Sequence, residues 1–185
     1  MKKSIVLTIC FAILVSFAAV MPAVAFESVS TTQAYDLVMN GSTAAMAYDS
    51  ATVYYIVDVR TPEEWRWVGH PGMNKAGIGN GLDLKVFNVA YMIDWKKQFV
   101  VNPSFVSEIN GLFGSVKENV VLIFMCRSGQ RGAAAASLLE PLGYRVMNMV
   151  NGFQGSTDAN GYRVRNGWVN DGFPYNYNAA GAYAD

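Results

Sequence analysis

A single cysteine, Cys126, lies where an apolar segment gives way to a short polar loop. Val120 to Met125 precedes it without a polar residue, and Arg127-Ser128-Gly129-Gln130-Arg131-Gly132 follows it, before a run of alanines. A loop between a strand and a helix can turn successive backbone N–H groups inward to form an anion cradle. The two arginines add permanent positive charge. These features favour the thiolate over the thiol, so the pattern indicates a nucleophilic Cys126 whose loop binds an anion.

The amino-terminal sequence predicts an exported protein. Two lysines precede an apolar run from Ile5 to Val20, and Ala23-Val24-Ala25 places small residues at the spacing of a signal-peptidase site. The run is shorter than the roughly 20 residues that span a bilayer, which favours a cleaved leader over a membrane anchor. We therefore expect residues 1–25 to be a secretory signal peptide. The mature protein is then periplasmic or secreted and has no stable membrane insertion.

Removal of this leader would also remove Cys10 and leave Cys126 without a disulfide partner. In an oxidising compartment a lone cysteine is either a reactive thiol or a small buried apolar residue, and the charged loop favours the thiol. One cysteine and one histidine, His70, do not make a typical zinc ligand set. No metal and no cofactor are therefore expected.

The charge balance argues against a nucleic-acid partner. The chain holds 14 basic and 14 acidic residues, and loss of the two leader lysines leaves 12 against 14. A mildly acidic protein is poorly suited to neutralise phosphates. The 160 residues that remain (185 minus 25) suffice for one domain with its own core. We expect this domain over residues 26–178, followed by a flexible tail at 179–185.

The hydrophobic pattern predicts an α/β fold. Buried strands are expected at Val53–Val59, Val120–Met125 and Arg145–Val150, with a weaker candidate at Val86–Met92. Helices are expected from Ala34 to near Gly41 behind a capping box at Ser30, after Asn102-Pro103, and from Gly132 to Leu139. Continuous apolar strands that alternate with helices indicate a parallel sheet covered on both faces, with the site beyond the strands' carboxyl ends. The segment from residue 162 to 185 is expected to be irregular.

Several segments resemble the motifs of single-domain rhodaneses, in the same chain order. They are Asp58-Val59-Arg60-Thr61-Pro62-Glu63-Glu64-Trp65, Gly69-His70-Pro71-Gly72, Cys126 to Arg131, and Asn148 to Gly155 with Gly167 to Pro174. The resemblance covers nearly all of residues 26–178 and implies a rhodanese-like fold, with a central parallel five-stranded sheet flanked by helices on both faces. The chain is most similar to a bacterial subgroup that has an insertion before the final glycine-tryptophan pair, here Ser156 to Asn166.

The same resemblance implies a sulfurtransferase. Cys126 would carry the transferred sulfur as a persulfide, and the loop from Arg127 to Gly132 would bind it. Asp58, Arg60 and Glu64 would brace the neighbouring strand end, as a structural ion-pair network and not as reacting groups. The expected donor is a small sulfur-containing anion, either thiosulfate or a persulfide. The expected acceptor is cyanide or a thiol, including a protein thiol.

The sequence departs from the family pattern near His70 and at the end of the cysteine loop. The turn lacks its usual isoleucine and an extra residue separates Trp65 from His70, so His70 is expected to be a turn residue held by hydrogen bonds. Gly132 stands where many relatives have serine. For Trp65, Trp67 and Trp95 a place at the pocket rim and ordinary packing remain equally open, and none is assigned a catalytic role.

Two other classes of function remain open. Cysteine phosphatases and arsenate reductases also use a thiolate, an amide cradle and an arginine, but their arginine follows the cysteine after five intervening residues. Here Arg131 follows Cys126 after only four, and this tighter loop fits one sulfur atom better than a tetrahedral phosphate. A binding module or sulfur carrier of the same fold that does not turn over would keep the same loop.

Overall fold

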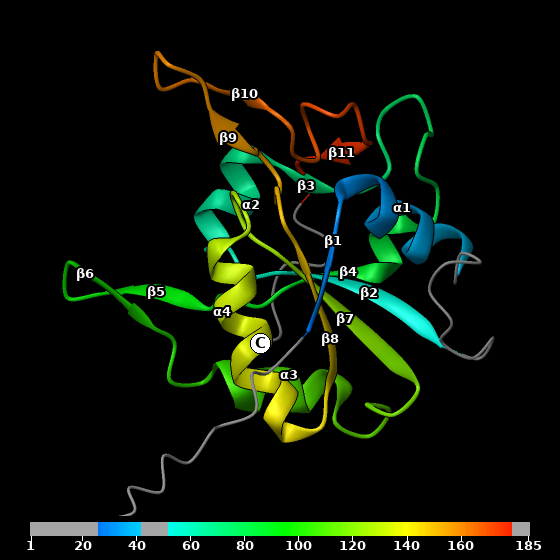
Figure 1. The fold of residues 1–185 in the computed structure, drawn as a ribbon, viewed down its shortest axis with the longest axis vertical. Coiled ribbons are helices and arrows are strands. Elements are labelled where there is room, and N and C mark those ends of the chain that lie inside the picture. Colours follow the sequence, from blue (N-terminus) through cyan, green and yellow to red (C-terminus); the bar gives the residue numbers. More distant parts are fainter. Residues whose placement is uncertain (1–25, 42–51, 179–185) are drawn as a thin grey trace, which may run out of the picture.

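The centre of the protein is a five-stranded sheet (Figure 1). The computed structural model describes residues 26–41 and 52–178, so the predicted leader and tail lie outside the described residues. In spatial order the strands are β1 (Glu27–Val29), β8 (Arg145–Met149), β7 (Val120–Met125), β2 (Val53–Asp58) and β4 (Val86–Asn88). Every neighbouring pair is parallel. The predicted α/β fold with a parallel five-stranded sheet is confirmed.

Helices cover both faces of this sheet (Figure 1). They are α1 (Thr31–Asn40), α2 (Pro62–Val68), α3 (Phe105–Phe113) and α4 (Gln130–Leu139), with the short 3-10 turns η1 (Leu82–Lys85) and η2 (Glu140–Leu142). Alternate strand residues face opposite sides, as the pleat requires: Ile123 packs in the core under α1, and Phe124 packs in the core under α3 and α4. No helix in the described ranges is long and apolar enough to cross a membrane.

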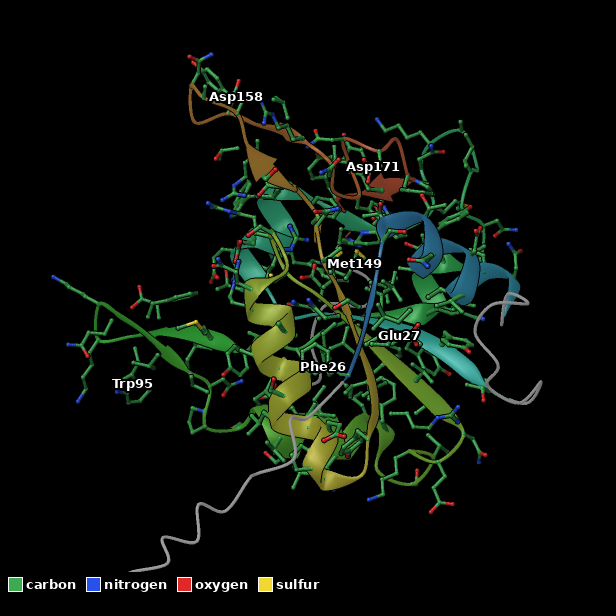
Figure 2. All side chains as sticks on the ribbon, viewed as in Figure 1. Phe26, Glu27, Trp95, Met149, Asp158 and Asp171 are labelled. Atoms are coloured by element: carbon green, nitrogen blue, oxygen red, sulfur yellow. The ribbon has the colours of Figure 1, made fainter. Side chains whose placement is uncertain are left out.

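The weak strand candidate from Val86 to Met92 is shorter than predicted. β4 ends at Asn88, which pairs with Asp58 at the end of β2, and beyond it the backbone N–H groups of Val89 and Tyr91 still donate to Asp58 O and Val59 O, at 3.1 and 3.2 Å. Met92 instead begins a separate antiparallel hairpin of β5 (Met92–Trp95) and β6 (Gln98–Val101). Figure 1 shows this hairpin extending away from the body of the domain, and Figure 2 shows Trp95 on it.

The helix predicted after Asn102-Pro103 begins two residues later than that pair implies. The side chain of Asn102 accepts a hydrogen bond from the Ser104 N–H at 2.9 Å and donates to Ala90 O at 2.9 Å. Asn102 therefore holds the preceding turn, and Ser104 is the residue before the first helical one. The helix packs one apolar face on the core, because Phe105, Ile109 and Phe113 are all buried.

The segment from residue 162 onward was expected to be irregular, and its described part consists mostly of turns, bends and irregular backbone but includes two short strands. It contributes β10 (Arg163–Arg165), which pairs with β9 (Ser156–Thr157), and β11 (Tyr175–Asn176), which pairs with β3 (His70–Pro71). Between them Trp168 is fully buried, and its indole N–H donates to Pro174 O at 2.8 Å. Figure 2 shows Asp158 at the tip of the β9–β10 hairpin and Asp171 near α1, where it accepts a hydrogen bond from Thr31 Oγ1.

Candidate active site

Strand β7 brings Cys126 to the carboxyl edge of the sheet, where the loop predicted to carry the chemistry begins. All six residues of β7 are buried, which fixes the strand end in the centre of the domain. The backbone N–H of Gly129 donates to Cys126 Sγ at 3.0 Å. Gly129 adopts φ +99°, and an added Cβ would lie 2.1 Å from Val150 O. Only glycine therefore lets the backbone turn its amide toward the sulfur.

A second loop supports the cysteine loop from the side of β8. The N–H of Phe153 donates to Cys126 O at 2.8 Å, and that of Gln154 donates to Arg127 O at 2.9 Å. Gly152 permits this contact, because a Cβ there would lie 2.3 Å from Cys126 O. The segment from Asn148 to Gly155 thus fixes the position of the Cys126 backbone.

Cys126 lines a pocket of about 490 Å³. The residues that line it come from four parts of the chain: Thr61, Glu64, Phe99, Cys126, Arg127, Ser128, Gln130, Arg131 and Arg163. Only 1% of the surface of Cys126 is exposed, so the thiol is recessed and a reacting atom must enter the pocket to reach it. Gly129 and Gly132 are buried behind the loop, and a Cβ on Gly132 would lie 2.6 Å from Asn148 Oδ1. This contact, with that of the same Cβ to Phe124 O at 2.9 Å, favours glycine at position 132.

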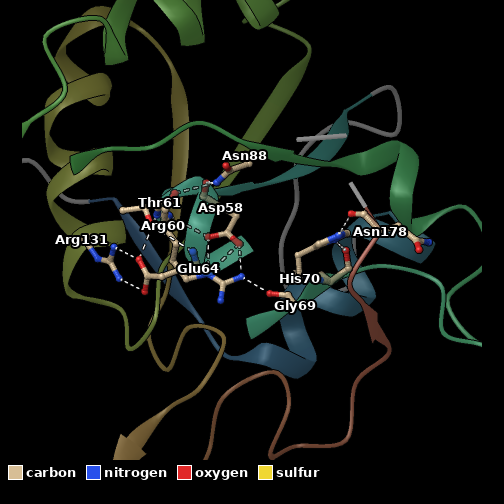
Figure 3. A network of polar contacts seen from close by, with 10 residues as sticks. Asp58, Arg60, Thr61, Glu64, Gly69, His70, Asn88, Arg131 and Asn178 are labelled. Carbon is tan, nitrogen blue, oxygen red and sulfur yellow. Dashed lines mark hydrogen bonds and ion pairs between the residues drawn. The ribbon is translucent and has the colours of Figure 1, made fainter. Parts of the chain in front are cut away.

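Arg131 is bound by a carboxylate. Its guanidinium donates to both oxygens of Glu64, at 2.6 and 2.8 Å (Figure 3). Burial opposes ionisation of Glu64, but the hydrogen bonds and charge of Arg131 outweigh it and lower the pKa of Glu64. Burial likewise opposes the charge of Arg131, yet Glu64 raises the pKa of Arg131. Arg131 lines the pocket, but much of its charge is compensated by Glu64.

The predicted trio of Asp58, Arg60 and Glu64 separates into two ion pairs (Figure 3). Asp58 and Arg60 are both fully buried, and the Asp58 carboxylate accepts from Arg60 Nε at 2.9 Å and from Nη2 at 2.5 Å. Arg60 Nη2 also donates to Gly69 O at 2.7 Å, and its Cζ lies 4.2 Å from the centre of the Phe153 ring. This pair joins the end of β2 to the loop after α2 and to the loop that supports Cys126.

Glu64 owes its position to a capping box at the start of α2. The Thr61 hydroxyl accepts from the Glu64 N–H at 3.3 Å, and Glu64 Oε2 accepts from the Thr61 N–H at 3.2 Å. The sequence contains this signal, with Pro62 at the first helical position, but only the structure shows that the capping carboxylate also holds Arg131.

His70 lies outside the pocket. Its ring stacks on Trp65 with centroids 3.7 Å apart, and its two nitrogens lie 3.0 Å from Pro71 O and 2.7 Å from Asn178 O. This arrangement agrees with the expected structural role of a turn residue. Trp65 is buried, whereas Trp67 and Trp95 are 80% and 59% exposed, and none of the three lines the pocket.

Sequence reasoning assigned no site role to three pocket residues. Thr61 lies just before α2, and the other two are Phe99 on β6 and Arg163 on β10. Both lie far from Cys126 in the chain, in hairpins that were not predicted, so no local spacing indicated them. The segment Ser156 to Asn166 had been identified as an insertion, which was the one available signal for Arg163. Within the described residues no three His, Cys, Asp or Glu side chains are placed to hold a metal ion.

These features define an α/β domain in which a parallel strand delivers a recessed cysteine to an amide- and arginine-lined loop. Residues 39–159 match the family described as the rhodanese-like domain. The chain belongs to this family.

Relatives of known sequence and structure agree with this membership. An uncharacterized protein of Rickettsia rickettsii is 30% identical over 141 residues, which are 76% of this chain and 94% of that protein. The senescence-associated protein DIN1 of Raphanus sativus is 33% identical over 110 residues, 59% of this chain and 46% of its own length. The crystal structure of Rv0390 from M. tuberculosis superposes with a TM-score of 0.62 at 26% identity, and the match covers 83% of this chain and all of that one.

Proposed function

We propose that this protein is a sulfurtransferase that carries sulfane sulfur as a persulfide on Cys126. The observation that carries the proposal is the hydrogen bond from the Gly129 N–H to Cys126 Sγ at 3.0 Å, beside a pocket that Cys126 lines together with three arginines. The rhodanese-like domain is consistent with sulfur-containing anions as donors and with thiols as acceptors.

In the first step the Cys126 thiolate attacks the outer sulfur of thiosulfate. A bond forms between Sγ and that sulfur, the bond between the two sulfurs of thiosulfate breaks, and sulfite leaves with the electron pair. The persulfide anion on Cys126 and the sulfite dianion together carry the charge of the reactants, so no external oxidant is needed. The Gly129 amide, and first-turn amides of α4 that have no acceptor within the helix, stabilise the anion.

In the second step an acceptor takes the outer sulfur. A thiolate or cyanide attacks it, the bond to Sγ breaks, and the electron pair returns to Cys126 as thiolate. The donor product leaves before the acceptor enters, which is the order of a ping-pong reaction. Because Cys126 is recessed, an acceptor that enters through the pocket would meet the outer sulfur before Sγ.

The test is the intact mass of the protein after exposure to thiosulfate, with and without a reductant. We expect a gain of one sulfur atom that the reductant removes, and no gain in Cys126→Ser, which keeps the size of the side chain. Addition of cyanide should then release the sulfur repeatedly. A stable persulfide that no acceptor removes would favour a carrier without turnover, and hydrolysis of an aryl phosphate in place of sulfur uptake would favour a cysteine phosphatase.

We also propose that the protein is exported and acts in the periplasm or outside the cell. The support is the lysine, apolar and Ala-Val-Ala sequence of residues 1–25. Cell fractionation followed by intact mass should give a chain that begins at Phe26. A cytoplasmic protein that retains its first 25 residues would contradict this proposal.

A further inference from the structure

Two hairpins outside the central sheet extend the pocket beyond the cysteine loop. The β5–β6 hairpin contributes Phe99, and the β9–β10 hairpin contributes Arg163. Both residues line the same pocket as the cysteine loop, in which the Cζ of Arg131 lies 5.9 Å from the centre of the Phe99 ring. The pocket therefore has an apolar wall and a cationic wall, neither of which is needed to hold a single sulfur atom.

Arg163 is held at the pocket. Its Nη1 donates to Gly155 O at 2.5 Å, and the backbone around it is fixed from the other side by Asn170, whose Nδ2 lies 3.4 Å from Arg163 O. The turn of the hairpin is ordered by Asp158, whose carboxylate accepts from the backbone N–H groups of Asn160 and Tyr162. A guanidinium that is anchored at one nitrogen keeps its remaining donors for a ligand, at a reduced cost in side-chain entropy.

The charges around Arg163 favour the binding of an anion. Partial desolvation and then the positive charge of Arg127 lower the pKa of Arg163. Arg131 is bound to Glu64, whereas neither Arg127 nor Arg163 is paired with a carboxylate in the part of the chain that the structure describes. Two arginines that repel one another and form no ion pair with a carboxylate are stabilised together by an anion placed between them.

The size of the pocket indicates a ligand larger than an inorganic ion. Its volume of about 490 Å³ lies within the range of roughly 300–1,000 Å³ that is usual for sites of organic ligands. Phe99 is 51% exposed, and such an aromatic side chain suits contact with a carbon chain. Thiosulfate has no carbon chain that Phe99 could contact.

We propose that Phe99 and Arg163 form a second subsite, which holds the organic part of a low-molecular-weight persulfide whose carboxylate binds Arg163. This inference rests on the persulfide chemistry proposed above for Cys126. The Cys126 thiolate attacks the terminal sulfur of the donor persulfide, a bond forms between Sγ and that sulfur, and the donor's own S–S bond breaks. The donor thiol leaves as a thiolate with the electron pair, so the exchange is balanced without an oxidant. Arg163 positions the donor and takes no part in the bond changes.

The test compares two donors that differ only in the charged group: the persulfide of mercaptopropionate and that of mercaptopropanol. Replacement Arg163→Ala should raise KM for the carboxylate donor by about tenfold, the loss expected for one charge-assisted hydrogen bond, with kcat little changed. KM for the alcohol donor should stay within about twofold. Arg163→Lys should restore part of the loss, since it keeps the charge but not the planar donor pair. Phe99→Ala should raise KM for both donors.

Arg165→Ala is the matched control, because it removes the same charge from the same strand, and Arg165 does not line the pocket. It should leave KM for both donors unchanged. Equal effects of Arg163→Ala on both donors, or no effect on either, would overturn the subsite while persulfide formation on Cys126 still supported the proposed function. Failure of every donor, thiosulfate included, to place sulfur on Cys126 would overturn both proposals.

Discussion

At the scale of single residues, Glu64 joins two elements through one carboxylate. It caps α2 at Thr61 and binds Arg131 at the start of α4. Because Arg131 lowers the pKa of Glu64 in the folded protein, the pair stabilises the fold above the ordinary carboxyl pKa of 4.5. That stabilisation is lost as the pH falls through the lower value of the folded state.

Replacement Glu64→Gln should therefore lower the free energy of unfolding at pH 7 by about 1 kcal/mol, since both side chains are partly exposed and the pair is partly screened. At about pH 3 the difference from the wild type should shrink toward zero. Urea unfolding of both proteins at the two pH values measures it. A difference that stays constant between them would show that the carboxylate charge is not what stabilises the pair.

The buried pair of Asp58 and Arg60 should respond far more strongly. Both side chains are fully buried, so removal of one leaves the other as an uncompensated charge. We expect Arg60→Met to lower the free energy of unfolding by about 3–5 kcal/mol. The exposed Arg165→Met, measured in the same urea series, should stay within about 0.5 kcal/mol. Adding Asp58→Asn to Arg60→Met should recover stability, and further loss in the double variant would contradict the charge argument.

At the scale of elements, the loop between β7 and α4 depends on glycine at one position. A Cβ on Gly129 would meet Val150 O at 2.1 Å and would have to adopt φ +99°. Gly129→Ala should therefore displace the amide from Sγ and lower the rate of persulfide formation by about a hundredfold, as loss of one oriented backbone donor does elsewhere. Single-turnover kinetics with thiosulfate measures that rate.

Gly77→Ala is the control for backbone strain alone. Gly77 also has positive φ, +79°, but an added Cβ there meets nothing within 4 Å. Gly77→Ala should lower the free energy of unfolding by about 1–2 kcal/mol and leave the rate of persulfide formation unchanged. Equal rates in Gly129→Ala and Gly77→Ala would remove the Gly129 amide from the mechanism.

The elements also show what the sequence could and could not predict. Strand β7 and its loop were predictable because an unbroken apolar run ends at Cys126, and α1 because Ser30 and Gln33 form a capping box. The β5–β6 hairpin could not be predicted, because its turn is Lys96-Lys97. Both lysines adopt positive φ, and the turn lacks the asparagine or glycine that signals such turns. Arg163 was missed for a different reason: its place at the pocket depends on tertiary packing and not on spacing from Cys126.

At the scale of the whole molecule, the last described part of the chain closes the fold over its first half. β11 pairs with β3, Asp171 bonds to Thr31 at the start of α1, and Trp168 packs in the core on the α1 side of the sheet. The same segment also supports the site indirectly, through the loop after β8. The backbone N–H of Trp168 donates to Gly152 O at 2.9 Å, and the backbone N–H of Val169 donates to Phe153 O at 3.1 Å. This segment therefore holds the loop that supports the Cys126 backbone.

Replacement Trp168→Ala should therefore affect stability and activity together. Loss of a fully buried indole leaves a cavity and should lower the free energy of unfolding by about 3–5 kcal/mol. Trp67→Ala removes the same side chain from a position that is 80% exposed and should change stability by no more than about 0.5 kcal/mol. Urea unfolding gives both values. Sulfur transfer, measured well below the unfolding midpoint, should fall only in Trp168→Ala, because only that variant loosens the loop that supports Cys126. Full activity in Trp168→Ala would mean that the last described segment stabilises the fold without ordering the site.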